Sequence, residues 1–361
     1  MPYRLNPNAL LVKGSERSTV CDPERSTFHI IPNSLYQILA ENKTGEIDQI
    51  KAKYAENDPE ISQIIQEYFD MLIEKDLIFF TNFPQYYTDL SMEWDYPAHI
   101  SNAIIDFRDQ NTEAFFIAAP QLEAQLTRFI QLRFFGPIAP DTIEKMMQAI
   151  DESIIESIEI IAPFQSFNDQ DKWFYLLKTY PRIAYFQFYG SPDYKEVTKE
   201  NHKSRGQIFT VKNALTSETH CGVIASHYFT VNIPTFTESQ HHNTCLNRKI
   251  SIDKDGYIKN CPSMLHHFGH ISETKLEDVI KNPEFTKYWN IKKDDISKCK
   301  DCEFRHICTD CRAYLENPED LHSAPLKCGY NPYTCQWEDW STNPLKQKAI
   351  EHYNLTELMD N

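Results

Sequence analysis

Cysteine is the residue type with the clearest capacity for chemistry in this chain of 361 residues, which contains ten of them. Six lie between residues 298 and 340: Cys299, Cys302, Cys308, Cys311, Cys328 and Cys335. The first four form two pairs, each with two residues between its sulfurs, and five residues separate one pair from the other. Two thiolates at this spacing can bind one metal from a single turn of backbone. The segment therefore predicts metal binding without specifying the metal.

Two more cysteines belong to the same region. Cys245 precedes a run of β-branched residues that leads to an Asp-Gly turn at Gly256, and four residues separate that glycine from Cys261. Apolar residues on both sides of an Asp-Gly turn predict a β-hairpin. Such a hairpin brings Cys245 back toward Cys261, so eight cysteines gather in one region.

Two other uses of these cysteines have to be weighed. The first twenty residues lack a basic start followed by an apolar core, so nothing indicates export to an oxidising compartment. We therefore expect a cytoplasmic protein with reduced thiols rather than disulfides. Paired cysteines of this spacing also occur in zinc ribbons, so two structural zinc sites stay an alternative to iron–sulfur clusters.

The layout resembles the SPASM domain, the auxiliary-cluster domain of many radical-SAM enzymes that modify peptides. The positions that match its pattern in order are Cys245, Gly256, Cys261, Cys299, Cys302, Cys308, Cys311 and Cys328. One departure is the two-residue gap before Cys311, where three residues are commoner. The resemblance implies two auxiliary [4Fe-4S] clusters.

The family's ligand scheme assigns the cysteines to these two clusters. It places Cys299, Cys302 and Cys308 on one cluster, with Cys328 or Cys335 as the fourth ligand. The other cluster takes three ligands from the hairpin and the block: Cys245, Cys261 and Cys311. Its fourth ligand stays open among Cys221, His241, His242 or an iron left free for a substrate group.

Composition limits the remaining possibilities. A formal net charge of -16 argues against a nucleic-acid partner and favours attraction of basic peptide segments. No apolar run is long enough to cross a membrane. The length predicts two or three domains.

Residues 1–83 form the first predicted domain. Strands are expected at Ala9–Val12 and Thr27–Ile31, helices at 33–40, 46–55 and from Pro59 onward, and a wing strand at Leu77–Phe80. Cys21 is assigned to a turn with a structural role only. This winged-helix pattern resembles the RiPP recognition element, which holds the leader of a ribosomally made precursor peptide. Recognition of that kind adds a peptide strand to a sheet edge beside the third helix.

Residues 84–97 are predicted to be a linker, and residues 98–235 alternate between strands and helices. The expected strands are Ile100–Phe107, Phe129–Phe135, Ile155–Ile161, Ile183–Tyr189 and Gln207–Val211, with helices at Gln121–Arg128, Asp141–Asp151 and Asp169–Lys178. Apolar strands separated by amphipathic helices predict an α/β fold with a parallel sheet. Ahead of a SPASM domain at 236–361, this segment resembles the partial (β/α) barrel of radical-SAM enzymes.

Two features of that barrel are missing. The loop after the first strand, Arg108–Pro120, has no cysteine, and none occurs between Cys21 and Cys221. Without three thiolates the cluster that reduces S-adenosylmethionine cannot assemble. The turn after the second strand keeps Gly136 and Pro137 but lacks the family's acidic residue. We therefore expect a degenerate barrel that does not use S-adenosylmethionine.

The whole chain is similar to the SPASM-domain peptide maturases of the grasp-with-spasm system. That resemblance implies a precursor peptide and an ATP-grasp peptide ligase as partners, with a non-radical scaffold role favoured here. The alternatives are a maturase that is itself catalytically active through an auxiliary cluster, and a zinc-stabilised adaptor. No catalytic residue is predicted. For Cys221 beside His220, a buried structural cysteine is favoured several-fold over a nucleophile. For His266 and His267, a solvated loop is as good an explanation as a place beside a cluster.

Overall fold

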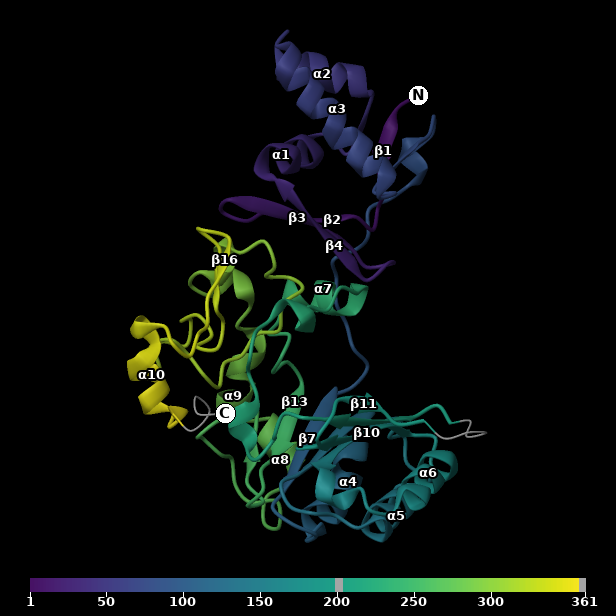
Figure 1. Ribbon diagram of the computed structural model, residues 1–361, viewed down its shortest axis with the longest axis vertical. Coiled ribbons are helices and arrows are strands. Elements are labelled where there is room, and N and C mark those ends of the chain that lie inside the picture. Colours follow the sequence, from purple (N-terminus) through teal and green to yellow (C-terminus); the bar gives the residue numbers. More distant parts are fainter. Residues whose placement is uncertain (199–203, 357–361) are drawn as a thin grey trace.

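The computed structural model describes residues 1–198 and 204–356. Figure 1 shows three regions along the long axis: the N-terminal helices and strands at one end, a large sheet at the other, and the cysteine-rich segment beside and between them. In the described residues no helix is both long and apolar enough to cross a membrane.

The N-terminal region contains two small antiparallel sheets and three helices. One sheet has the order β5(Thr44–Gly45), β1(Tyr3–Leu5), β6(Ile78–Phe80), and the other β2(Leu10–Val12), β3(Arg17–Asp22), β4(Thr27–Pro32). The helices are α1(Asn33–Glu41), α2(Ile47–Ala55) and α3(Pro59–Glu74). Asp58 caps α3 by accepting hydrogen bonds from two backbone N–H groups of its first turn. All three predicted helices are present, whereas β1, β3 and β5 were not predicted.

The predicted position of Cys21 in a turn is wrong. Cys21 lies in β3, pairs with Phe28 of β4, and is fully buried. The sequence of β3, RSTVCD, is too polar to read as a strand. It forms one because its buried side packs against the C-terminal region, a contact that local pattern does not reveal.

The large sheet has eight strands in the order β11-β12-β10-β9-β8-β7-β13-β14. The parallel strands are β7(Asn102–Phe107), β8(Phe129–Phe134), β9(Ser157–Pro163), β10(Ile183–Tyr189) and β12(Gln207–Val211), joined by β13(Lys249–Ile252), which pairs parallel with β7. The edge strands β11(Lys195–Glu196) and β14(Ile258–Lys259) are antiparallel to their neighbours. This largely parallel α/β sheet agrees with the prediction, and strands β10 and β12 have the predicted bounds.

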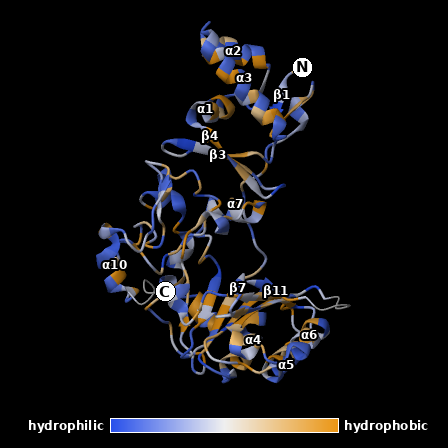
Figure 2. Ribbon diagram, in the orientation of Figure 1, coloured by the Kyte–Doolittle hydropathy of each residue, from blue (hydrophilic) through white to orange (hydrophobic). Residues whose placement is uncertain are grey.

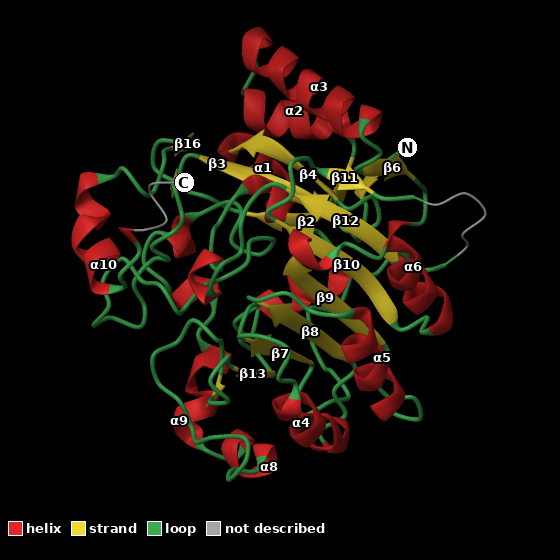
Figure 3. Cartoon of the chain, turned by 60° about the horizontal axis from the view of Figure 1, so that its bottom comes forward, coloured by secondary structure: helices red, strands yellow, loops and turns green. Residues whose placement is uncertain are grey.

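Helices cover one face of this sheet: α4(Glu113–Ala124), α5(Pro140–Ala149), α6(Gln170–Thr179) and the short α8(Leu276–Ile280) (Figure 3). The side chains between sheet and helices are apolar, and Figure 2 shows hydrophobic residues concentrated along the strands of this sheet. On the opposite face the strands present polar residues, among them Gln131, Arg133 and Glu159. The cysteine-rich region borders this polar face at β7 and β13.

The predicted loop Arg108–Pro120 and the helix expected from Gln121 are wrong in their bounds, because α4 begins at Glu113. A proline inside a helix removes one hydrogen bond and usually marks an end. Pro120 has no N–H to donate to the carbonyl four residues earlier in the helix. Because Pro120 lies on the exposed side, that carbonyl faces solvent.

The predicted hairpin between Cys245 and Cys261 is present as β13 and β14. Gly256 has φ +85° in its turn, and a Cβ there would lie 2.2 Å from the ring of His270. The turn therefore requires glycine on two grounds. The remaining elements are short: α7(Ile233–Ser239), α9(Pro283–Thr286), α10(Gln347–His352) and the hairpin β15(Tyr330–Asn331), β16(Gln336–Trp337).

Candidate metal centre

Four cysteines of the C-terminal block line one cavity of about 30 Å³. They are Cys299, Cys302, Cys308 and Cys328, called the first cysteine set below. A single 3-10 turn over Cys299–Asp301 positions the first two, with the Cys302 N–H donating to the Cys299 carbonyl at 3.0 Å. The spacing of two residues thus acts as the sequence suggested, by presenting two sulfurs from one turn.

A buried lysine faces the first cysteine set. The Nζ of Lys293 lies 3.5 Å from the Sγ of Cys308 and 3.9 Å from Asp310, and only 4% of the residue is exposed. Burial alone would lower the pKa of Lys293, but the neighbouring sulfurs of Cys308 and Cys299 raise it, and the net direction is upward. A cation at the sulfurs favours the thiolate form that metal binding requires.

The thiols themselves are buried. Burial raises the pKa of Cys299 to about 12 and that of Cys308 to about 11, with Lys293 opposing the shift in both cases. Such thiols stay protonated at neutral pH when no metal is bound. A metal that binds them must displace these protons, so metal affinity increases with pH.

Cys335 lies apart from this cavity. It occupies a position with φ +56° in the turn between β15 and β16, and the Tyr330 hydroxyl is hydrogen-bonded to it. Of the two residues considered for the fourth position, the structure brings Cys328 to the cavity and leaves Cys335 outside its lining.

A second group of thiols, Cys221, Cys245, Cys261 and Cys311, gathers where the β13–β14 hairpin meets the block; we call it the second cysteine set. A Cβ built on Gly222 would lie 2.8 Å from the Sγ of Cys311, which places Cys221 and its neighbour against that sulfur. Burial, together with the nearby sulfurs of Cys221 and Cys245, raises the pKa of Cys261 to about 12.

Three cations surround the second cysteine set, of which Arg133 and Lys327 are buried and Lys249 is half-buried. Arg133 of β8 donates from Nη1 to the Sγ of Cys221 at 2.7 Å, and Lys249 of β13 places its Nζ 3.7 Å from the Sγ of Cys245. Lys327 donates to the Cys221 carbonyl at 2.9 Å and lies 4.2 Å from the centre of the Tyr314 ring. Burial lowers the pKa of Lys327 to about 8, although the sulfurs of Cys311 and Cys221 oppose the shift.

Arg133 is itself fixed by a carboxylate. Its Nε and Nη2 donate to the two oxygens of Asp106 at 2.6 and 2.7 Å, and both residues are at most 2% exposed. The bidentate pair sets the plane of the guanidinium, and this leaves Nη1 directed at Cys221. The large sheet thus contributes charged groups to the second cysteine set, which sequence reasoning missed because the partners are 27 and 88 residues apart.

The histidines considered as ligands point elsewhere. His241 is hydrogen-bonded to the Met92 carbonyl at 2.9 Å, and His242 to Asn290 at 3.1 Å. His220 is hydrogen-bonded to Thr216 rather than to the sulfur of Cys221. His266 and His267 are exposed. Among the residues considered for the fourth position of the second cysteine set, only Cys221 lies with its thiols in the described structure.

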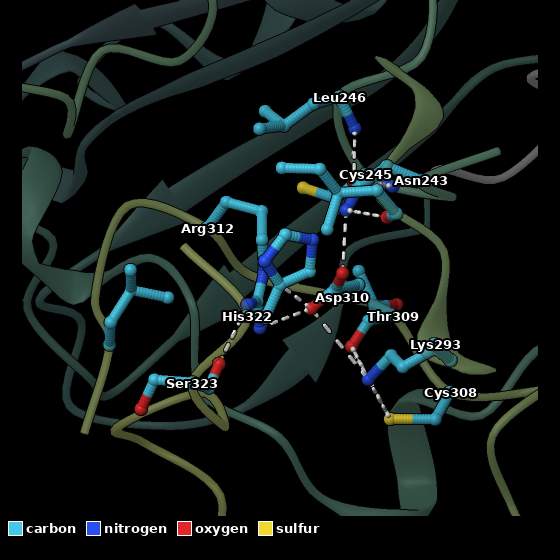
Figure 4. Close-up of polar contacts among 12 residues, drawn as sticks. Asn243, Cys245, Leu246, Lys293, Cys308, Thr309, Asp310, Arg312, His322 and Ser323 are labelled. Atoms are coloured by element: carbon cyan, nitrogen blue, oxygen red, sulfur yellow. Dashed lines mark hydrogen bonds and ion pairs between the residues drawn. The ribbon is translucent and has the colours of Figure 1, made fainter. Parts of the chain in front are cut away.

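Asp310 connects the two cysteine sets, and sequence reasoning missed it (Figure 4). The residue is fully buried, and its carboxylate accepts from Asn243 at 2.5 Å and pairs with Arg312 at 2.8 Å and with Lys293. Asn243 in turn accepts from the backbone N–H of Cys245 at 3.0 Å. One carboxylate therefore holds the lysine beside the first cysteine set and the backbone that carries a thiol of the second.

The donor chemistry of both sets fits an iron–sulfur cluster. Clusters of several iron atoms are held by thiolates that surround them, whereas one zinc ion draws four donors to about 2.3 Å from a single point. The thiols of the first cysteine set enclose a cavity. Within residues 1–198 and 204–356, no three His, Cys, Asp or Glu side chains converge as one bound ion would require.

A larger cavity, of about 480 Å³, lies at the carboxyl ends of β7 and β13. Asp106 forms part of its lining, together with the start of α4 and the turn between β13 and β14. Ligands of parallel sheets bind at this end of the strands. Sequence reasoning missed this cavity, because the pairing of β13 with β7 that creates it joins segments almost 150 residues apart.

Comparison with protein families identifies the class of this region. Residues 244–303 match the SPASM family, an iron–sulfur cluster-binding domain. The chain therefore contains a SPASM domain, and domains of this type bind iron–sulfur clusters. This finding suggests a maturase of the radical-SAM/SPASM type with an auxiliary cluster. A comparison with curated proteins gives no match.

Proposed function

We propose that this protein binds two auxiliary iron–sulfur clusters and takes part in maturation of a ribosomally made peptide. The observation that carries the proposal is the arrangement of eight thiols in two sets of four in and around the SPASM domain. Cys299, Cys302, Cys308 and Cys328 are the proposed ligands of one cluster, and Cys221, Cys245, Cys261 and Cys311 those of the other. Cys335 is not a ligand in this proposal.

The N-terminal region is proposed to hold the precursor's leader on the free edge of β4. In the sheet order β2-β3-β4, one side of β4 pairs with β3 and the other pairs with no described strand. An extended peptide can bind such an edge through backbone hydrogen bonds, while its side chains enter neighbouring pockets.

The flank of this edge supports the same proposal. Two contacts tie the ends of β4 to the region of α3: Arg25, just before β4, pairs with Asp76, just after α3, at 3.4 Å, and Ser34, just after β4, is hydrogen-bonded to Tyr68 of α3 at 3.0 Å. Apolar side chains stay exposed on both elements: Ile30 on β4 and Ile61 and Ile64 on α3 are 42–47% exposed. A strand docked there would cover them.

We further propose that the protein is a non-radical scaffold that works with an ATP-grasp peptide ligase. The segment after β7 has no cysteine, so the three thiolates needed to bind a cluster that reduces S-adenosylmethionine are lacking there. The chemical step then falls to the partner ligase, and this chain presents the peptide.

A second candidate is a maturase that acts on the peptide itself. The cavity at the ends of β7 and β13 favours it, because Asp106 in its lining binds Arg133, which contacts Cys221. A peptide group in this cavity would lie close to the second cysteine set.

Anaerobic purification followed by iron, acid-labile sulfide and zinc analysis tests the metal assignment. Two clusters predict about eight iron and eight sulfide per chain, whereas zinc without sulfide would replace the proposal with a zinc-stabilised adaptor. Incubation with S-adenosylmethionine and a reductant is expected to give no 5′-deoxyadenosine; its formation would refute the non-radical role.

Peptide binding tests the leader site. The probes are synthetic versions of the small peptides encoded next to the gene of this protein, and the variant Ile64→Asp is expected to abolish their binding.

A further inference from the structure

The N-terminal sheet β2-β3-β4 packs directly on the first cysteine set. Leu10, Val12 and Cys21 of this sheet share one apolar core with Ile307 and Cys308. The sulfur-bearing residues Cys302 and Cys328 pack against the same core. Figure 1 shows β3 and β4 lying between the N-terminal helices and the C-terminal segment that contains β16.

Polar contacts join the two parts at the residue that follows Cys302. Glu303 is 1% exposed, and its Oε1 accepts from Arg17 Nε at 2.6 Å and from the Tyr330 hydroxyl at 2.5 Å. The hydroxyl of Thr19, also on β3, donates to the Glu303 carbonyl at 2.8 Å. A buried carboxylate depends on such partners, so the position of Glu303 and that of β3 are set together.

The strand with the free edge touches the same segment. Phe28 of β4 packs edge-on against Phe304, with ring centres 5.5 Å apart, and lies 6.0 Å from Phe229. Phe304 also contacts Tyr330 at 5.1 Å. Glu303 binds β3, and Phe304 packs against β4. These two residues directly follow Cys302 in the sequence.

The cysteine-bearing segment has little secondary structure to fix it. Between Cys299 and Cys311 the structure contains one 3-10 turn and no strand or α-helix. A segment of this kind is ordered by its metal, because binding free energy acts as folding free energy.

We infer that the metal bound by the first cysteine set positions the N-terminal sheet, with Arg17 and Glu303 as the connecting residues. Loading of this set fixes Cys302, which fixes Glu303 and Phe304, and these hold β3 and β4 in place. Binding of the leader at β4 is part of the proposed function. Given that binding, the same contacts place the bound peptide beside the first cysteine set. Loading of the second set has no such effect.

Hydrogen exchange of the anaerobically purified full chain tests this inference. Cys328→Ser is expected to lose the first cluster and to speed amide exchange in β3 and β4 at least tenfold. Cys245→Ser, the matched control in the second cysteine set, is expected to lose the other cluster and leave exchange in β3 and β4 within twofold of the parent. Unchanged exchange in β3 and β4 after iron loss from Cys328→Ser would overturn the inference.

A second variant covers the case in which Cys328→Ser does not fold. Arg17→Gln removes the connecting ion pair and leaves all thiols, so the parental iron content should persist while β3 and β4 exchange faster. Parental exchange in this variant would also overturn the inference. These measurements need no peptide; failure of the parent to bind the synthetic peptides would refute the leader site alone.

Discussion

Replacing Arg133 by methionine tests the link between the large sheet and the second cysteine set. Arg133 is 1% exposed as a residue and makes two hydrogen bonds to Asp106, which is 2% exposed. Removing one partner of a buried ion pair costs about 3–5 kcal/mol, because the other charge stays buried without compensation. That is a large part of the ~5–15 kcal/mol stability typical of a domain. Denaturant unfolding under anaerobic conditions measures the loss.

The loss should depend on pH in a definite direction. Burial raises the pKa of Asp106, and Arg133 opposes the rise. Without Arg133 the folded-state pKa rises further above the unfolded value, so the protonated carboxyl favours the folded state. Arg133→Met is therefore expected to lose stability as pH rises from the unfolded-state pKa of Asp106 to its raised folded-state pKa, and to recover it as pH falls back through this window. A penalty that grows on acidification would contradict this explanation.

The double variant Arg133→Met, Asp106→Leu separates stability from metal binding. With both charges removed, unfolding free energy should return to within about 1 kcal/mol of the parent, since buried pairs replaced by apolar groups of similar volume are often neutral. Cys221 still lacks its N–H donor, so the paramagnetic resonance spectrum of the second cluster should stay altered. If the double variant is as unstable as the single one, the lost ion pair between Arg133 and Asp106 is not the cause of the instability. If its spectrum is parental, the 2.7 Å contact to Cys221 has no effect on the metal.

Three further results are expected. Cys328→Ser should lower bound iron by about half, whereas Cys335→Ser should keep the parental content; the opposite pattern in an iron and sulfide assay would exchange their roles. Asp310→Ala should cost about 3–5 kcal/mol in denaturant unfolding, because two buried cations lose their carboxylate, while Asp294→Ala, at a more exposed ion pair, should cost at most ~1 kcal/mol. Cys221→Ser should change the spectrum of one cluster only, and a parental spectrum would remove this residue from the second set.

The secondary structure was predictable where local pattern and burial agree. Strands β10 and β12 are rich in β-branched and aromatic residues, and their bounds are those expected. The pattern failed in β3, whose side chains are buried by a distant segment, and at Pro120, which a helix tolerates on its exposed side. In both cases tertiary context decides the conformation, and sequence windows do not contain it.

The candidate site was predictable in its residue types and only partly in its grouping. Spacing identifies Cys299 and Cys302 as one unit because they belong to one turn. It does not identify the neighbours of Cys221, which come from β8 and the block, nor the role of Asp310 between the sets. Charged partners of a buried sulfur lie far away in sequence, and a single chain gives no signal for such pairs.

The position of the second cysteine set gives the large sheet a direct part in that site. Strand β13 pairs in parallel with β7, so the hairpin that carries Cys245 and Cys261 begins within the sheet. The polar face of the sheet then supplies Arg133 from β8 and Lys249 from β13, one to each of two sulfurs. Net charge and hydrogen bonds at the sulfurs set the reduction potential of an iron–sulfur cluster. A change on this face should therefore alter the second cluster and leave the first unchanged, since Lys293, the buried cation at the first set, is not part of the sheet.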